Sequence, residues 1–207
     1  MKRTVALAVL LCLLSAAAQA GEPTDEDGWI TLFNGQDLSG WRLSENGQIE
    51  VQDGKIVIKG PRSHLFTEQS FKDFHFKADV MTTPGSNSGI YFHTEYQEEG
   101  WPTKGHEAQV NVTHRDPVKT GSLYGIVKLY ETPAKDNEWW TQEIIVRGKQ
   151  ITIKVNGKTV VDYTEPDDVE GGRKLSSGRF ALQAHDPDSV VYYRNIKVQP
   201  LGDATSK

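Results

Sequence analysis

Phe74-His75-Phe76-Lys77-Ala78-Asp79-Val80 is the stretch that decides the fold class of this chain. Its apolar and polar residues alternate one by one from 74 to 80. In a β-strand, such alternation places the apolar side chains on one face and the polar ones on the other. An α-helix would need apolar residues three to four positions apart. We therefore predict a half-buried strand here.

Further segments of this kind follow on both sides, and turn-forming pairs separate them. These pairs are Asn34-Gly35, Asp53-Gly54, Arg147-Gly148 and Asn156-Gly157. The segments are 29–33, 49–58, 88–93, 105–112, 143–146, 150–155, 159–163, 179–185 and 190–198. About a dozen short strands without intervening helices favour two packed antiparallel sheets.

The first residues resemble a secretory signal. Lys2 and Arg3 precede an apolar run at 5–14, and Ala18-Gln19-Ala20 fits a cleavage site. The run is about half the roughly twenty residues that a membrane span needs, so we expect no retained membrane anchor. Cleavage near Ala20 would leave a periplasmic or secreted protein.

We divide the chain into the signal (1–20), a flexible lead-in (21–28), one domain (29–201) and a polar tail (202–207). The single cysteine lies in the signal, so the mature chain has no disulfide, thiolate nucleophile or cysteine-based zinc site. The net charge is −5 and no basic stripe is visible, which argues against nucleic acid as a partner. The 7 Tyr and 5 Trp suit a β protein with aromatic surfaces.

Residues 105–112 carry the clearest candidate chemistry. In a strand, Glu107, Gln109 and Asn111 share one face, and the opposite face is apolar. An ordinary solvated strand face is the simplest interpretation. Two other segments favour a lined groove instead, because Tyr91 and His93 lie on one face in 88–93, as do Gln183 and His185 in 179–185.

Aromatic residues could edge such a groove and stack on sugar rings, whose hydroxyls would bind the amides and the carboxylate. The candidates are Trp101, Tyr124, Trp139, Trp140 and Tyr193. Because neighbours on a strand face opposite ways, we expect one of Trp139 and Trp140 to be buried and the other exposed.

A conventional glycosidase uses a pair of carboxylates, whereas the strand at 105–112 offers only Glu107. The histidines show no regular metal spacing, so no cofactor is required by the sequence. A divalent cation remains an open alternative, held by His and carboxylate groups from different strands or by a calcium loop at 186–188.

Several motifs follow one another along the chain: Leu32-Phe33-Asn34-Gly35-x-Asp37-Leu38-x-Gly40-Trp41, Asn87-Ser88-Gly89-Ile90-Tyr91-Phe92, Gly105-x-Glu107-x-Gln109-x-Asn111, Thr120-Gly121-x-x-Tyr124, Glu138-Trp139, Val155-Asn156-Gly157, Leu182-Gln183-x-His185 and Arg194-Asn195-Ile196. Together they resemble the 3-keto-disaccharide hydrolase domain family. The chain departs from the family pattern at His93 and Trp140, where relatives carry Arg and Asn.

The resemblance implies a concanavalin-A-like antiparallel β-sandwich (jelly roll) and glycosides already oxidised to a ketone at C3 as substrates. A C3 ketone acidifies the C2 proton. One base can then remove that proton, the C1 substituent leaves, and water adds back, so a carboxylate pair is not needed.

On this hypothesis Glu107 or His185 is the catalytic base, and Gln109, Asn111 and Gln183 hold hydroxyls. Arg194, His93 or a divalent ion would stabilise the enolate, while Tyr91 and Trp139 would contact the sugar. Tyr124 is either a general acid or a stacking residue. Two alternatives stay open: a non-catalytic, lectin-like carbohydrate-binding module and a conventional glycoside hydrolase.

Overall fold

The computed structural model describes residues 27–202, and every regular element in that range is a β-strand. The predicted signal at 1–20, most of the lead-in and most of the tail lie outside the described residues. The strands are β1 (Ile30–Thr31), β2 (Trp41–Leu43), β3 (Gln48–Gln52), β4 (Lys55–Lys59), β5 (Ser63–Thr67), β6 (Phe74–Thr82), β7 (Asn87–Thr94), β8 (His106–Asn111), β9 (Trp140–Arg147), β10 (Gln150–Val155), β11 (Lys158–Thr164), β12 (Arg179–Ala184) and β13 (Val191–Pro200). Between residues 27 and 202 we find no helix with the length and apolar character that a membrane crossing requires.

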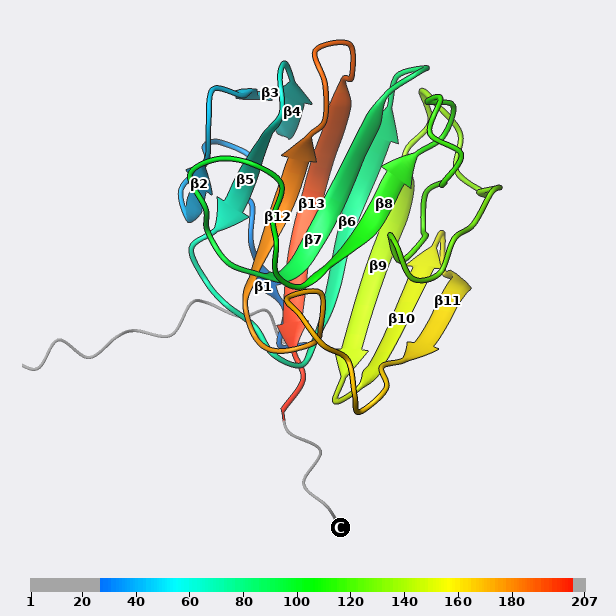
Figure 1. Cartoon of the computed structure of the whole chain (residues 1–207). Coiled ribbons are helices and arrows are strands. Elements are labelled where there is room, and N and C mark those ends of the chain that lie inside the picture. The colour runs from blue at the N-terminus through cyan, green and yellow to red at the C-terminus, as the bar shows by residue number, and fades with distance from the viewer. Residues whose placement is uncertain (1–26, 203–207) are drawn as a thin grey trace, which may run out of the picture.

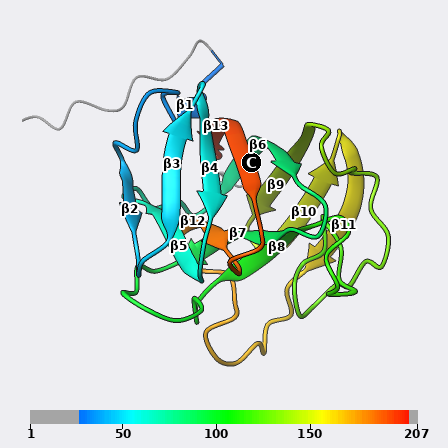
Figure 2. The same ribbon diagram turned by 90° about the horizontal axis from the view of Figure 1, so that it is seen from above.

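The strands form two antiparallel sheets that lie face to face (Figures 1 and 2). The larger sheet has the order β11-β10-β9-β6-β13-β4-β3, with β1 paired to β13. The smaller sheet has the order β2-β5-β12-β7-β8. The prediction of an antiparallel β-sandwich is confirmed.

The core lies between the sheets and follows the alternation that the sequence shows. On β6, Phe74, Phe76, Ala78 and Val80 are buried, whereas the intervening side chains are partly exposed. Across the interface Phe180 of β12 packs on the rings of Phe74 and Phe76, with centroid distances of 4.7 and 4.5 Å. Contacts of this kind join the sheets by apolar burial, the dominant favourable term in folding.

Two tight turns confirm the predicted hairpins. Asp53-Gly54 joins β3 to β4, and Asn156-Gly157 joins β10 to β11. Both residues of each pair have positive φ, at 46° and 73° in the first turn and 51° and 74° in the second. This geometry matches the twist of the flanking strands and favours Asn, Asp and Gly.

Some boundaries differ from the sequence prediction. The segment expected at 29–33 forms only the short strand β1, and strands β2 and β5 were not predicted. Trp140 is buried in the core and Trp139 is partly exposed, as their alternation predicts. Tyr193, expected at the groove, is instead fully buried in the core, where its hydroxyl lies 2.8 Å from Ser88 Oγ.

Strands β7 and β8 are buried on both faces. Loops cover the face that points away from the core, and the segment 119–127 hydrogen-bonds along the free edge of β8. Its contacts include Gln109 N to Ser122 O at 3.0 Å and Tyr124 N to Glu107 O at 2.9 Å. The polar side chains on this face are therefore mostly buried beneath loops.

Candidate functional site

A cavity of about 370 Å³ lies over the outer face of the five-stranded sheet. Strands β7, β8 and β12 form its floor, and the loops after β7, β8, β11 and β12 form its walls. Its lining residues are Asn87, Tyr91, Trp101, Glu107, Gln109, Asp116, Tyr124, Arg173, Gln183 and His185. This mixture of amides, aromatic rings and charged groups is typical of a binding site.

Glu107 lies on the floor of the cavity and is only 4% exposed. Burial raises the pKa of Glu107 to about 7, although the Tyr91 hydroxyl, the Arg173 cation and the Gln183 amide act in the opposite direction. Burial also raises the pKa of Tyr91, with the Glu107 charge adding to the effect. Tyr91 therefore stays a hydroxyl donor, and Glu107 titrates near neutrality.

The Gln183 side chain bridges these two groups. Its Nε2 donates to Tyr91 Oη at 3.0 Å and to Glu107 Oε1 at 3.2 Å. Because an ionised carboxylate only accepts hydrogen bonds, the amide nitrogen must face Glu107. Gln183 Oε1 is then left buried without a partner, so it is ready to accept a hydrogen bond from a ligand hydroxyl.

Two further amide side chains, those of Gln109 and Asn87, are hydrogen-bonded to each other and also line the cavity. Gln109 Nε2 donates to Asn87 Oδ1 at 3.2 Å, and both side chains are buried. Asn111, two residues farther along β8, donates from Nδ2 to the carbonyls of Asp116 and Val118 at 2.9 and 2.8 Å. Asn111 thus shapes the loop that carries Asp116 and does not line the cavity.

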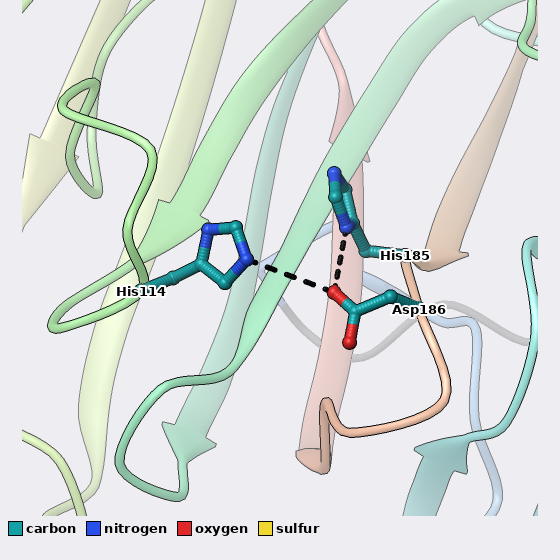
Figure 3. A group of neighbouring side chains, drawn as sticks. All are labelled: His114, His185 and Asp186. Carbon is teal, nitrogen blue, oxygen red and sulfur yellow. Dashed lines mark hydrogen bonds and ion pairs between the residues drawn. The ribbon is translucent and has the colours of Figure 1, made fainter.

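His185 follows directly after β12 and lines the cavity. Its Nδ1 lies 2.8 Å from Asp186 Oδ2 (Figure 3). Its ring contacts the rings of Trp101 and His114, with centroid distances of 5.4 Å in both cases. These contacts hold the imidazole in one orientation.

Arg173 is the cation at the rim. Its guanidinium carbon lies 5.7 Å from the centre of the Tyr91 ring, and its charge acts on Glu107. The loop that bears it is anchored by Glu165, whose two carboxylate oxygens accept from Leu175 N at 3.0 and 2.9 Å. Glu165 also contacts His106 Nε2 at 3.0 Å. The Glu165 carboxylate, hydrogen-bonded to the buried His106 ring and to Leu175 N, therefore fixes the position of the loop.

The structure brings seven of the predicted residues to one cavity: Tyr91, Trp101, Glu107, Gln109, Tyr124, Gln183 and His185. The other predicted residues lie outside this cavity. His93 has a positive φ of 55°, which interrupts the strand alternation. Its ring nitrogens contact Lys72 O at 2.7 Å and Ser176 N at 3.1 Å, so it ties loops together beneath the surface.

Arg194 and Trp139 also lie outside this cavity. Arg194 is on β13 of the eight-stranded sheet, Trp139 directly precedes β9, and the two stack on each other with the guanidinium carbon 4.0 Å from the ring centre. Three lining residues were not predicted from the sequence: Asn87, Asp116 and Arg173. The two-residue period of β7 places Asn87 on the same face as Tyr91, so the sequence pattern could have identified it. Asp116 and Arg173 lie in loops, where no periodic pattern indicates which way a side chain points.

One group of side chains within residues 27–202 has the composition of a metal site. It consists of His114, His185 and Asp186, whose nearest donor atoms all lie within 4.8 Å of one another. His114 Nε2 lies 3.8 Å from Asp186 Oδ2 (Figure 3). The distances alone allow either a divalent ion or a hydrogen-bonded cluster.

Residues 28–199 match the family model of the 3-keto-alpha-glucoside-1,2-lyase-like domain. The chain belongs to this family. The resemblance in the sequence motifs is thereby confirmed. A 3-keto-disaccharide hydrolase of Bacteroides thetaiotaomicron is 24% identical, over 86% of this chain and 80% of its own length.

Solved structures of other proteins show the same fold. A candidate glycosyl hydrolase of Parabacteroides distasonis superimposes with a TM-score of 0.73 at 24% identity, covering 84% of this chain and 94% of that one. The carbohydrate-binding module CBM66 of Bacillus subtilis gives 0.59 at 16% identity, covering 77% and 95%. At these identities the likeness establishes the fold alone.

Proposed function

We propose that this protein hydrolyses glycosides already oxidised to a ketone at C3, by elimination followed by hydration. The observation that carries the proposal is Glu107, a buried carboxylate whose pKa lies near 7 at the floor of a polar cavity. A catalytic base is most efficient when its pKa is close to the working pH. The relative from Bacteroides thetaiotaomicron, a 3-keto-disaccharide hydrolase, supports this substrate class.

The first step is removal of the C2 proton by the Glu107 carboxylate. The C2–H electrons move into an enolate whose charge rests on the C3 oxygen, and Arg173 supplies a cation for it. The C1–oxygen bond then breaks and leaves a C1=C2 double bond conjugated with the C3 ketone. Arg173 thus takes the role that the sequence had assigned to Arg194 or His93.

The second step reverses the first with water in place of the departed group. Water adds to C1, and Glu107, whose proton has by then exchanged with solvent, protonates C2, so the net reaction is hydrolysis. The buried amides orient the sugar in both steps. Gln183 Oε1 in particular lacks a donor within residues 27–202, and a sugar hydroxyl would supply one.

The test compares a 3-keto-glycoside with its unoxidised parent in deuterated water. We expect release of sugar from the keto compound alone, with deuterium at C2 of the product. Glu107→Gln should abolish both release and exchange, while Glu138→Gln, at an exposed position, should leave them unchanged. Turnover of the keto compound without deuterium at C2 would contradict the mechanism.

A conventional glycosidase is the second candidate, because the structure places a second carboxylate, Asp116, in the cavity. Two carboxylates across a sugar are the usual requirement. Asp116 Oδ1, however, accepts from Val118 N at 2.8 Å and serves the loop. Asp116→Asn should therefore retain most activity on the keto substrate; hydrolysis of unoxidised glycosides that Asp116→Asn abolishes would favour the conventional mechanism.

The lectin-like alternative draws on the fold shared with a carbohydrate-binding module. A binding protein has no use for a buried carboxylate that titrates near neutrality, because burying it destabilises the ionised form. Binding of 3-keto-glycosides without any product would support this alternative. We also propose export after cleavage near Ala20, which N-terminal sequencing of the mature protein would test.

A further inference from the structure

The proton positions on His185 follow from its carboxylate partner. Asp186 Oδ1 accepts from the backbone N–H groups of Asp188 and Ser189 at 3.0 and 3.1 Å. Asp186 Oδ2 accepts from Ser189 Oγ at 2.9 Å and faces His185 Nδ1 at 2.8 Å. A carboxylate surrounded by donors is ionised and only accepts. His185 therefore carries a proton on Nδ1, and Nε2 is the atom left to exchange protons.

The proton positions on His114 follow in the same way. Its Nδ1 accepts from the backbone N–H of Asp116 at 3.1 Å and lies 3.2 Å from Asn87 Nδ2. A backbone N–H cannot be anything but a donor, so Nδ1 holds the lone pair and Nε2 holds the proton. That Nε2–H faces Asp186 Oδ2 at 3.8 Å (Figure 3).

This arrangement does not fit a metal centre. A histidine that binds a metal presents a lone pair to the ion and donates its other N–H to a neighbour. His114 shows the opposite pattern, with its proton on the nitrogen nearest Asp186. In the arrangement observed, the Asp186 carboxylate is hydrogen-bonded to Nδ1–H of His185 and faces Nε2–H of His114 at a longer, electrostatic distance.

We infer that Asp186 is a positioning residue that keeps His185 protonated at Nδ1 and aims Nε2 at the leaving oxygen of the substrate. The inference rests on the proposed function. During elimination, Nε2–H of the imidazolium gives its proton to the departing C1 oxygen. During hydration, the neutral Nε2 takes a proton from the water that attacks C1, so the cycle closes. Asp186 keeps the Nδ1 proton in place throughout.

Asp186→Asn tests this directly. The two backbone N–H groups require an oxygen at the Oδ1 position, so the new Nδ2 must occupy the Oδ2 position beside His185. An N–H donor there forces the lone pair onto Nδ1 and the proton onto Nε2. Nitrogen-15 NMR of the free protein should show Nδ1–H in the wild type and Nε2–H in the variant. Asp188→Asn, an exposed neighbour with the same charge change, is the control and should keep Nδ1–H.

The leaving group supplies the second readout. A 3-keto-glycoside with a sugar leaving group needs a proton on the departing oxygen, whereas a nitrophenolate departs without one. For Asp186→Asn we expect the single-turnover rate of leaving-group release, which precedes hydration, to fall by about 10²-fold on the first substrate and by less than about threefold on the second. General acid catalysis typically contributes about 10²-fold or more. Equal losses on both substrates would mean that Asp186 only maintains the fold.

Further outcomes would show whether the cluster binds a metal and whether Asp186 sets the His185 tautomer. If Zn²⁺ shifts the His114 and His185 signals together, and a chelator lowers the activity, the cluster is a metal centre and the inference is wrong. If wild-type protein turns over no 3-keto-glycoside, the proposed function fails, but the NMR comparison still decides whether Asp186 sets the tautomer. Should Asp186→Asn not fold, Ser189→Ala removes one hydrogen bond to Asp186 and should show a smaller loss with the same leaving-group dependence.

Discussion

Gly89 on β7 leaves the space that the Glu107 side chain on β8 fills. A β-carbon at Gly89 would lie 2.2 Å from Glu107 Oε1 and 2.9 Å from Glu107 Cγ. The φ angle of Gly89 is not positive, so its lack of a side chain, and not its backbone freedom, is what the fold uses. The candidate base can lie flat on the sheet floor only because its neighbour has no β-carbon.

Gly89→Ala should therefore displace the Glu107 carboxylate and lower kcat sharply. Glu107→Asp, with a shorter side chain, should also lose activity by itself. Because the two changes relieve each other, the double variant should be more active than the product of the single effects predicts. Kinetic constants on a 3-keto-glycoside, with thermal unfolding as a check of folding, measure this coupling. Simple multiplication of the two losses would show that the residues do not interact.

The raised pKa of Glu107 predicts how stability depends on pH. Its ordinary value is 4.5 and its value in the folded protein is about 7. The folded state thus binds the proton more tightly than the unfolded state. The associated stability is complete below pH 4.5 and is lost as the pH rises through 7, by about 3 kcal/mol in total.

Glu107→Gln has no such titration. Relative to the wild type, the free energy of unfolding of this variant should therefore increase between pH 5 and pH 8. Urea unfolding at the two pH values measures the difference. Glu138→Gln, at an exposed position, is the control and should show a constant difference. A gap for Glu107→Gln that does not change with pH would contradict the raised pKa. Wild-type activity should rise over the same pH range, since only the ionised carboxylate is a base.

Removal of the Arg173 cation should weaken stabilisation of the enolate. We expect Arg173→Ala to lower kcat by about 10²-fold, the usual effect of losing one oxyanion-stabilising group, and Arg173→Lys to lose less. Lys174→Ala changes an exposed neighbour and should have no effect. Steady-state kinetics on one 3-keto-glycoside suffice. An effect confined to KM would assign Arg173 to substrate binding alone.

Trp101 should contribute to binding more than to chemistry. Its ring is 40% exposed, lines the cavity and packs on His185. Trp101→Ala should raise KM by about tenfold, the size expected for losing an aromatic stacking surface. Tyr130→Ala is a suitable control, because Tyr130 is 65% exposed and does not line the cavity. A loss of kcat at unchanged KM would instead show that Trp101 mainly holds the His185 ring.

Several features of the site were predictable because a strand has a fixed two-residue period. That period alone places Glu107 and Gln109 on one face of β8 and Gln183 opposite the apolar residues of β12. His93 broke the rule, since its positive φ turns the side chain out of the alternation. No glycine or turn-forming pair marks this position in the sequence, so the strand pattern predicted the wrong direction for the His93 side chain.

By itself, the sequence determined the fold class, the family and the floor of the site, because alternation, turn pairs and motif order are local properties of the chain. Only the tertiary structure determined which loop residues complete the cavity above these strands. Asp116, Arg173 and the contact between His114 and Asp186 come from loops far apart in sequence. Hydrogen bonds such as those of Glu165 to Leu175 N and of Asn111 to Val118 O set the positions of these loops. No periodicity links such partners, so their meeting depends on the packing of the whole sandwich.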